Sequence, residues 1–209
     1  CVLLLCVIVC FLRYRPPPRL ARGGASAASD VDKGKDETVP ALQQELGLNN
    51  PMQVPRIERV VVSMGVNNAH LDRKKLEEAF GHLQTITGQK PKITRAKRSV
   101  AAFRLREGSE IGCCVTLRRA RMYEFIDRLV SIALPRVRDF RGLNPKAFDG
   151  HGNFSMGLTE QLVFPEINAD KAHNVQGMNI AVVTSAVSDA DGVALLKAVG
   201  FPFQKADAK

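Results

Sequence analysis

The sequence has no Trp, two Tyr and four His among its 209 residues. The histidines show no metal-ligand spacing, so we expect neither a metal nor any other cofactor. Five Cys are too few and too badly placed for a disulfide scaffold, because three lie in one apolar run and Cys113 and Cys114 are adjacent. We interpret them as reduced thiols. Apolar residues make up 45% of the chain, which excludes a wholly disordered protein.

Motifs that carry catalysis or bind nucleotides are also missing. Gly88–Lys90 lacks the glycine spacing of a phosphate-binding loop, and Gly150–Gly152 lacks the third glycine of a dinucleotide fingerprint. Asp149 and His151 are close in the chain, but a loop His beside an Asp is more often structural than catalytic. The aromatic signature of an RRM and the GxxG clamp of a KH domain are absent. The sequence therefore predicts a protein that is not an enzyme, with an RNA-modifying enzyme as a distant alternative.

Positive charge is concentrated in one part of the chain. Residues 91–141 carry 13 basic and 5 acidic side chains, which gives this segment a net charge of +8 against +9 for the whole chain. A basic stretch inside an otherwise near-neutral protein indicates a face that binds a polyanion, and nucleic acid is the favoured ligand. A solvated face that only aids solubility is the alternative.

The first 30 residues differ in composition from the rest. Residues 1–12 are uninterruptedly apolar, and a basic stretch rich in Pro, Ala and Gly follows. As a helix, the apolar run would span about 18 Å, which is too short for a hydrocarbon core of about 30 Å. We interpret residues 1–30 as a disordered extension: a fragment, a mis-start or a presequence. Residues 31–209 are predicted to form a single domain, and a membrane-tethered, lipoprotein-like basic module is the rival hypothesis.

Hydrophobic periodicity predicts alternating helices and strands. Apolar residues at helical spacing predict helices over 36–46, 76–86 and 122–133, and after a capping box at Ser188 and Asp191. Glu124 and Arg128 have the spacing of an exposed ion pair on one of these helices. Strands are predicted over 57–64 and 178–184. Lys92–Arg98 is expected to be an exposed loop, and 144–157 a long loop or irregular hairpin.

Two further segments, Phe103–Arg106 and Ile111–Arg118, alternate apolar and polar residues around a turn at Glu107–Ser109 and predict a hairpin. Its buried side would carry Phe103, Leu105, Ile111, Cys113, Val115 and Leu117. Its open side would carry Arg104, Arg106, Thr116 and Arg118, which makes that side a candidate anion-binding face. Together the elements predict an α+β fold, a largely antiparallel or mixed sheet with helices packed on one face.

Several motifs in this order and spacing resemble the bacterial-type large-subunit ribosomal protein L5 family. They are Met52–Glu58, Ser63–Val66, Thr87–Pro91, Ser99–Ala101, Pro135–Gly142, Phe148–Gly157, Phe164–Ile167 and Phe201–Phe203. The match runs from about residue 36 to residue 204, whereas residues 1–30 have no counterpart. The resemblance implies an L5-like fold and a structural, RNA-binding role in translation.

The resemblance also implies partners and a location. The family binds 5S rRNA in the central protuberance of the large subunit and contacts P-site tRNA through a basic loop. Further partners would be 23S-type rRNA, neighbouring large-subunit proteins and a small-subunit head protein at the intersubunit bridge. The location would be the ribosome, in the cytoplasm or in an organelle, with no membrane partner.

The site residues follow from the motifs and from the hairpin together. The family's 5S rRNA face falls on Ser63, Gln89 and Thr116, and the hairpin adds Arg104, Arg106 and Arg118. The tRNA-contacting loop spans residues 94–103, with Arg95, Lys97, Arg98 and Ser99 as its candidate contacts. The family usually has Asn at Ser63 and often has Gly at Ala102.

Overall fold

The computed structural model describes residues 40, 42–48, 50–66, 72–168, 172 and 174–204. The predictions for residues 1–30 and for the start of the first helix lie outside these residues. Residues 42–46 are helical, as expected, and Leu42 is buried. Among the described helices, none has the length and apolar character needed to cross a membrane.

Five strands form one sheet in the order β2-β3-β1-β5-β4. The strands are β1 (Ile57–Gly65), β2 (Lys92–Arg95), β3 (Glu110–Leu117), β4 (Phe154–Leu158) and β5 (Met178–Thr184). Every neighbouring pair is antiparallel, and β1 is the middle strand because it pairs with both β3 and β5. The predicted α+β fold with an antiparallel sheet is confirmed.

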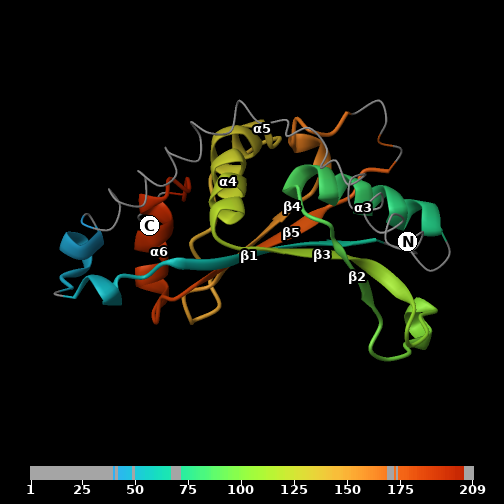
Figure 1. Cartoon of the computed structure of the whole chain (residues 1–209), viewed down its shortest axis with the longest axis horizontal. Helices are drawn as coiled ribbons and strands as arrows, with labels where there is room; N and C mark the ends of the chain where they lie inside the picture. The colour runs from blue at the N-terminus through green and yellow to red at the C-terminus, as the bar shows by residue number, and fades with distance from the viewer. Residues whose placement is uncertain are drawn as a thin grey trace, which may run out of the picture.

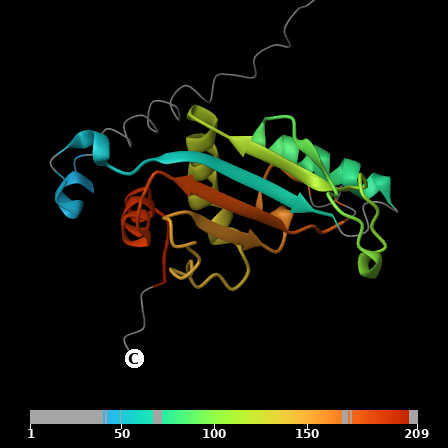
Figure 2. The ribbon, with the colours of Figure 1, turned by 90° about the horizontal axis from the view of Figure 1, so that it is seen from below.

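The longer helices lie behind the sheet. Figure 1 shows α3 (Arg73–Thr87) and α4 (Ala120–Arg128) on one side of the sheet, with α6 (Asp189–Ala198) at the end where β5 finishes. In Figure 2 the opposite face of β3, β1 and β5 is turned toward the viewer, with α3 and α4 behind it. Short helical turns are η1 (Pro51–Gln53), η2 (Ala101–Phe103), η4 (Gln161–Val163) and α5 (Leu134–Arg136). Within the part of the chain that the structure describes, helices thus cover one face of the sheet and leave the other open.

The core lies between the sheet and these helices, on the predicted stripes. Leu83 and Ile86 of α3 are fully buried, as are Val60 and Val62 of β1. The expected stripe of the third helix is buried as well: Met122, Phe125, Ile126, Leu129 and Ala133. Because alternate strand residues face opposite sides, burial of one side of β1, β3 and β5 leaves the intervening side chains on the open face.

Local signals set the ends of the helices. Gly88 ends α3 in the left-handed conformation, with φ 63°, and its N–H donates to the carbonyl of Gln84. Ser188 caps α6 by accepting a hydrogen bond from the backbone N–H of Asp191. After α4 the chain continues as the π-helical turn η3 (Leu129–Ala133), just before Pro135. Proline has no N–H for the regular helical bond, and such turns accommodate the defect.

The predicted hairpin between residues 103–106 and 111–118 is wrong. β3 pairs with β1 on one side and with β2 on the other, so the segment expected to be an exposed loop supplies the outer strand. Residues 101–103 form the turn η2 instead, and Phe103 is 74% exposed where burial was expected. The long connection between β2 and β3, residues 96–109, is hereafter called the tip loop. It projects beyond the end of the sheet (Figures 1 and 2).

Candidate nucleic-acid interface

The open face of the sheet carries a row of side chains that crosses all five strands. Lys92 pairs with Cys114, Cys114 with Ser63, Ser63 with Asn179, and Asn179 with Gly157. Partners in register point to the same side of a sheet, so these residues form one continuous line. Most are small or polar, and together they present a shallow surface of backbone, hydroxyl and amide groups.

The structure brings together the three residues that the family resemblance assigns to 5S rRNA. Thr116 lies opposite Val61, two positions from Ser63, so the two hydroxyl side chains are diagonal neighbours on the open face. Gln89 follows α3 and donates its side-chain amide N–H to the carbonyl of Thr116 at 3.4 Å. Ser63, Gln89 and Thr116 are all half-buried, so each is positioned by the scaffold while part of its surface stays accessible.

The tip loop is ordered by its own hydrogen bonds. Val100 and Leu105 exchange backbone bonds of 3.0 and 3.1 Å, and Ala96 donates its N–H to the carbonyl of Ser109 at 2.8 Å. The hydroxyl of Ser99 accepts the backbone N–H of Glu107 at 2.9 Å. The predicted contact residue Ser99 therefore has a structural bond within the loop.

Four basic side chains of the tip loop are exposed: Lys97, Arg98, Arg104 and Arg106. With Glu107 as the single acidic residue, residues 96–109 carry a net charge of +3. Arg95, at the end of β2, is instead within 3.5 Å of the carboxylate of Glu110 in an exposed ion pair. The loop therefore gathers four cations that are free of ion pairs with other described residues.

The arginines predicted to share one hairpin face do not lie together. Arg104 and Arg106 belong to the tip loop at the start of β3, whereas Arg118 follows its other end. A strand rises about 3.3 Å per residue, so the length of β3 separates them by more than about 20 Å. The alternation of Arg with Phe and Leu imitates a strand, but Arg104 adopts a left-handed conformation, with φ 51°, which ends η2. Their contact with RNA stays a prediction.

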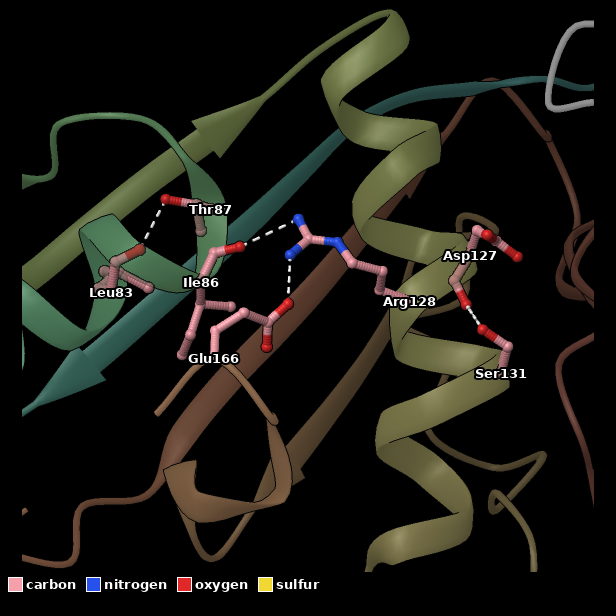
Figure 3. A network of polar contacts seen from close by, with 7 residues as sticks. All are labelled: Leu83, Ile86, Thr87, Asp127, Arg128, Ser131 and Glu166. Atoms are coloured by element: carbon pink, nitrogen blue, oxygen red, sulfur yellow. Dashed lines mark hydrogen bonds and ion pairs between the residues drawn. The ribbon is translucent and has the colours of Figure 1, made fainter. Parts of the chain in front are cut away.

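An ion pair behind the sheet ties three elements together (Figure 3). Arg128 of α4 contacts Glu166 with Nη1 and Oε1 2.5 Å apart, and its other terminal nitrogen donates to the carbonyl of Ile86 at 3.1 Å. Both side chains are about three-quarters buried. The predicted partner of Arg128 was Glu124, but the structure turns Arg128 toward the C-terminal end of α3, where a cation also meets the negative end of the helix dipole.

The two adjacent thiols lie on opposite faces of β3. Cys113 is buried in the core, and this burial raises the pKa of its thiol to about 11. Cys114 is half-buried on the open face between Ser63 and Lys92, and its pKa is also raised, chiefly by burial and against the effect of Lys92. The expectation that Cys113 is a small core residue is confirmed.

The Asp149–His151 pair is a turn. One carboxylate oxygen of Asp149 accepts the backbone N–H of His151 at 2.9 Å, and the other accepts the side-chain N–H of Asn153 at 2.8 Å. These hydrogen bonds hold the pKa of Asp149 below its ordinary value, and the bond from the Asn153 side chain has the largest effect. No group of three or more His, Cys, Asp or Glu suited to a metal ion occurs within the described residues.

Two residues of the open face were not predicted from the sequence. Lys92 and Asn179 occupy the same row as Ser63, one on each side of it. Asn179 could have been found because it is the only polar residue among residues 178–183 of the expected strand. Lys92 could not, because all four residues of β2 are exposed and the segment shows no alternation.

Two protein-family models match this chain, and both place it among the structural proteins of the large ribosomal subunit. The family model described as "Ribosomal protein L5" matches residues 50–106, and the model "ribosomal L5P family C-terminus" matches residues 110–203. The segment matched by the second model contains β3, β4 and β5, and the segment matched by the first contains β1, which lies between β3 and β5 in the sheet. The two matched segments therefore share one sheet.

Curated relatives named large ribosomal subunit protein uL5 match most of the chain. The protein of Syntrophus aciditrophicus is 56% identical over 173 residues, which is 83% of this chain and 97% of the relative. That of Methylococcus capsulatus is 53% identical over 81% of this chain and 95% of the relative. That of a Synechococcus species is 54% identical over 79% of this chain and 92% of the relative.

The chain belongs to the ribosomal protein L5 family. It is a structural ribosomal protein of the large subunit and not an enzyme, as predicted. The rival hypothesis of a membrane-tethered basic module receives no support from these relatives.

Proposed function

We propose that this protein binds 5S rRNA through the open face of its sheet and P-site tRNA through its tip loop. The observation that carries the first half is that Ser63 and Thr116 are neighbours on the open face and that Gln89 donates a hydrogen bond to the backbone of Thr116. None of the described helices covers this face (Figure 2). The second half rests on the four exposed cations of the tip loop. Both contacts support translation in the ribosome, the location that family membership gives.

The chemistry of the open face suits folded RNA. Its row of small and polar side chains allows close approach, and hydroxyl and amide groups can bond phosphates, base edges and 2′-hydroxyls. Lys92 and Asn179 extend the face on either side of Ser63. Aromatic stacking is not needed on this surface, where shape and backbone contacts dominate.

A hydroxyl-to-methyl substitution tests the open face. Thr116→Val keeps the shape of the side chain and removes one hydrogen-bonding group, which should weaken binding of a 5S rRNA fragment about 2- to 12-fold. The matched control is Thr85→Val, an exposed position of α3 on the covered side of the sheet. Binding is measured by titration at fixed salt, and equal affinities for the two variants would contradict the proposal.

Cys114 gives a second, independent test of the same face. Bound 5S rRNA should slow alkylation of this half-buried thiol, since it lies beside Ser63 on the open side. Cys113 should react slowly with or without RNA because it faces the core. Fragment-ion mass spectrometry separates the adjacent positions. Unchanged labelling of Cys114 in a saturated complex would place the RNA elsewhere.

The tip loop is tested by its salt dependence. Removing one phosphate-binding side chain should lower the slope of log K against log salt by roughly 0.7–0.9. Lys97→Ala and Arg98→Ala should therefore flatten this slope for tRNA and leave 5S rRNA binding intact. Lys74→Ala, an exposed position of α3, is the control of equal charge. Loss of 5S rRNA binding with tRNA binding unchanged would reverse the assignment.

The position of Arg104 and Arg106 refines the proposal. Both lie in the tip loop with Lys97 and Arg98, so we assign them to the tRNA side, and Arg118 alone remains with 5S rRNA. Arg104→Ala and Arg106→Ala should flatten the salt slope for tRNA, and Arg118→Ala the slope for 5S rRNA. Contacts with 23S-type rRNA, neighbouring large-subunit proteins and a small-subunit head protein belong to the same proposal through family membership.

A further inference from the structure

Phe103 is the most conspicuous apolar side chain of the tip loop. It is 74% exposed at the end of η2, and its ring touches no other aromatic ring among the described residues. The sheet and the helices behind it form a core that this residue does not enter. A single exposed apolar residue is common on protein surfaces, but this one lies on a projecting loop beside four exposed cations, which makes it a candidate ligand contact.

The backbone around Phe103 is fixed before any ligand arrives. Arg104 next to it has φ 51°, and its N–H donates to the carbonyl of Ala101 at 3.0 Å. The exchange of bonds between Val100 and Leu105 closes the loop around this turn, and Ser99 bonds Glu107 below it. Ordering the ring on binding therefore costs little conformational entropy.

The surroundings of Phe103 identify the chemistry of the ligand. Two small residues, Ala101 and Ala102, precede it, and the loop carries four exposed cations. An aromatic ring beside several cations and small neighbours is what binds unpaired bases: phosphates meet the cations and a base stacks on the ring. A protein partner would need a larger apolar patch, because the exposed apolar residues of the tip loop are confined to residues 100–103 and basic side chains lie on both sides of them along the chain.

Resting on the proposed function of the tip loop, we propose that Phe103 stacks on an unpaired or end-exposed base of the RNA that this loop binds. Stacking tolerates any base, since every base has a π-face. The loop then selects RNA by the accessibility of a base and not by its identity. A closed duplex of the same charge offers no such base and binds through its phosphates alone.

The absence of Trp from the sequence allows a direct test. Phe103→Trp in the full chain introduces a single reporter, whose fluorescence should be quenched by an RNA hairpin with an unpaired loop. A fully paired RNA duplex with equal phosphates should quench it far less. Val187→Trp, which is 87% exposed just before α6, is the matched control and should respond to neither. Equal quenching by hairpin and duplex would overturn the proposal.

A second pair of variants measures the contribution to binding. Phe103→Leu keeps an apolar side chain without a π-system and should weaken hairpin binding about 5- to 150-fold, while Phe103→Tyr retains it. Unchanged hairpin affinity in Phe103→Leu would sink the stacking role. Binding of a 5S rRNA fragment, measured on the same preparations, separates this result from failure of the open-face proposal. A photocrosslinker at position 103 that marked only protein in assembled ribosomes would show a protein contact instead.

Discussion

At the scale of single residues, Gly112 shows how closely the central strands approach each other. It lies in β3 opposite Gly65, and a Cβ at this position would come within 2.3 Å of the carbonyl oxygen of Met64. The obstacle is the backbone of the middle strand, which no side-chain rotation can move aside. We expect Gly112→Ala to lower the free energy of unfolding by about 1–3 kcal/mol, measured by urea denaturation.

Gly81 provides the matched control for this prediction. It lies inside α3, and a Cβ there meets nothing within 4 Å. Gly81→Ala should therefore raise the stability by about 0.5–1 kcal/mol, because alanine restricts the unfolded chain and favours the helix. Destabilisation of both variants to a similar degree would show that the approach of β3 to β1 is not what demands glycine at position 112.

Cys113 should make the free energy of unfolding fall at alkaline pH. Burial raises the pKa of its thiol from 9.0 to about 11, so the unfolded chain loses this proton at a lower pH than the folded one. The stability is therefore intact below pH 9 and falls as the pH rises toward 11, by on the order of 2–3 kcal/mol. Cys113→Val should remove this part of the decline in unfolding experiments from pH 7 to 11. Parallel curves for the two proteins would contradict the assignment.

At the scale of elements, the Arg128–Glu166 pair joins α3, α4 and the segment after η4. Arg128 Nε and Glu166 Oε2 are buried without a hydrogen-bond partner, so the pair is only partly satisfied. Removing one partner alone, as in Glu166→Leu, should cost about 3 kcal/mol because the remaining charge stays largely buried. Thermal or urea unfolding measures this loss.

The double variant distinguishes attraction from packing. Arg128→Met with Glu166→Leu replaces both charges by apolar groups of similar length, which should recover most of the stability lost in Glu166→Leu. The bond from Arg128 to the carbonyl of Ile86 is missing from both Arg128→Met variants and cancels in the thermodynamic cycle. Additive effects in the cycle would mean that the ion pair has no energetic coupling.

The sequence predicts elements best where a buried stripe repeats. The helices α3 and α4 were predicted correctly because each buries one face at helical spacing. The strand over 57–64 was predicted correctly because its run of β-branched residues favours a strand. Phe103–Arg106 shows the limit. Alternation alone cannot distinguish a paired strand from an exposed loop, and only the pairing of β2 with β3 decides which segment enters the sheet.

At the scale of the whole molecule, the candidate site was partly predictable. Ser63, Gln89 and Thr116 come from three elements, and their meeting depends on a register that no local pattern contains. The family resemblance supplied Ser63 and Gln89, alternation in 111–118 had already placed Thr116 on the open side, and the basic loop followed from both charge and resemblance. The prediction that Arg118 and Arg104 share one face failed because a count of charges along the chain does not show which residues lie close together in the fold.

Two separate surfaces should act independently. Thr116 lies near the end of β3 and the tip loop at its start, about 20 Å apart by strand rise. Distant sites without shared partners contribute additively within about 0.3–0.5 kcal/mol. The double variant Thr116→Val/Lys97→Ala should show the 5S rRNA affinity of the first single variant and the tRNA affinity of the second. Larger coupling, in titrations of the free protein with each RNA, would mean that one surface spans both.

The order of the strands has a consequence for how the molecule is made. β1 is the first of the five strands to be synthesised, yet it is the middle strand of the sheet. One edge of β1 stays unpaired until β5 is made, because Ile57 pairs with Thr184. A nascent chain that stops before β5 therefore leaves an apolar central strand with an unpaired edge, which favours association with other chains. The surface proposed to bind 5S rRNA is complete only after β5 has been synthesised.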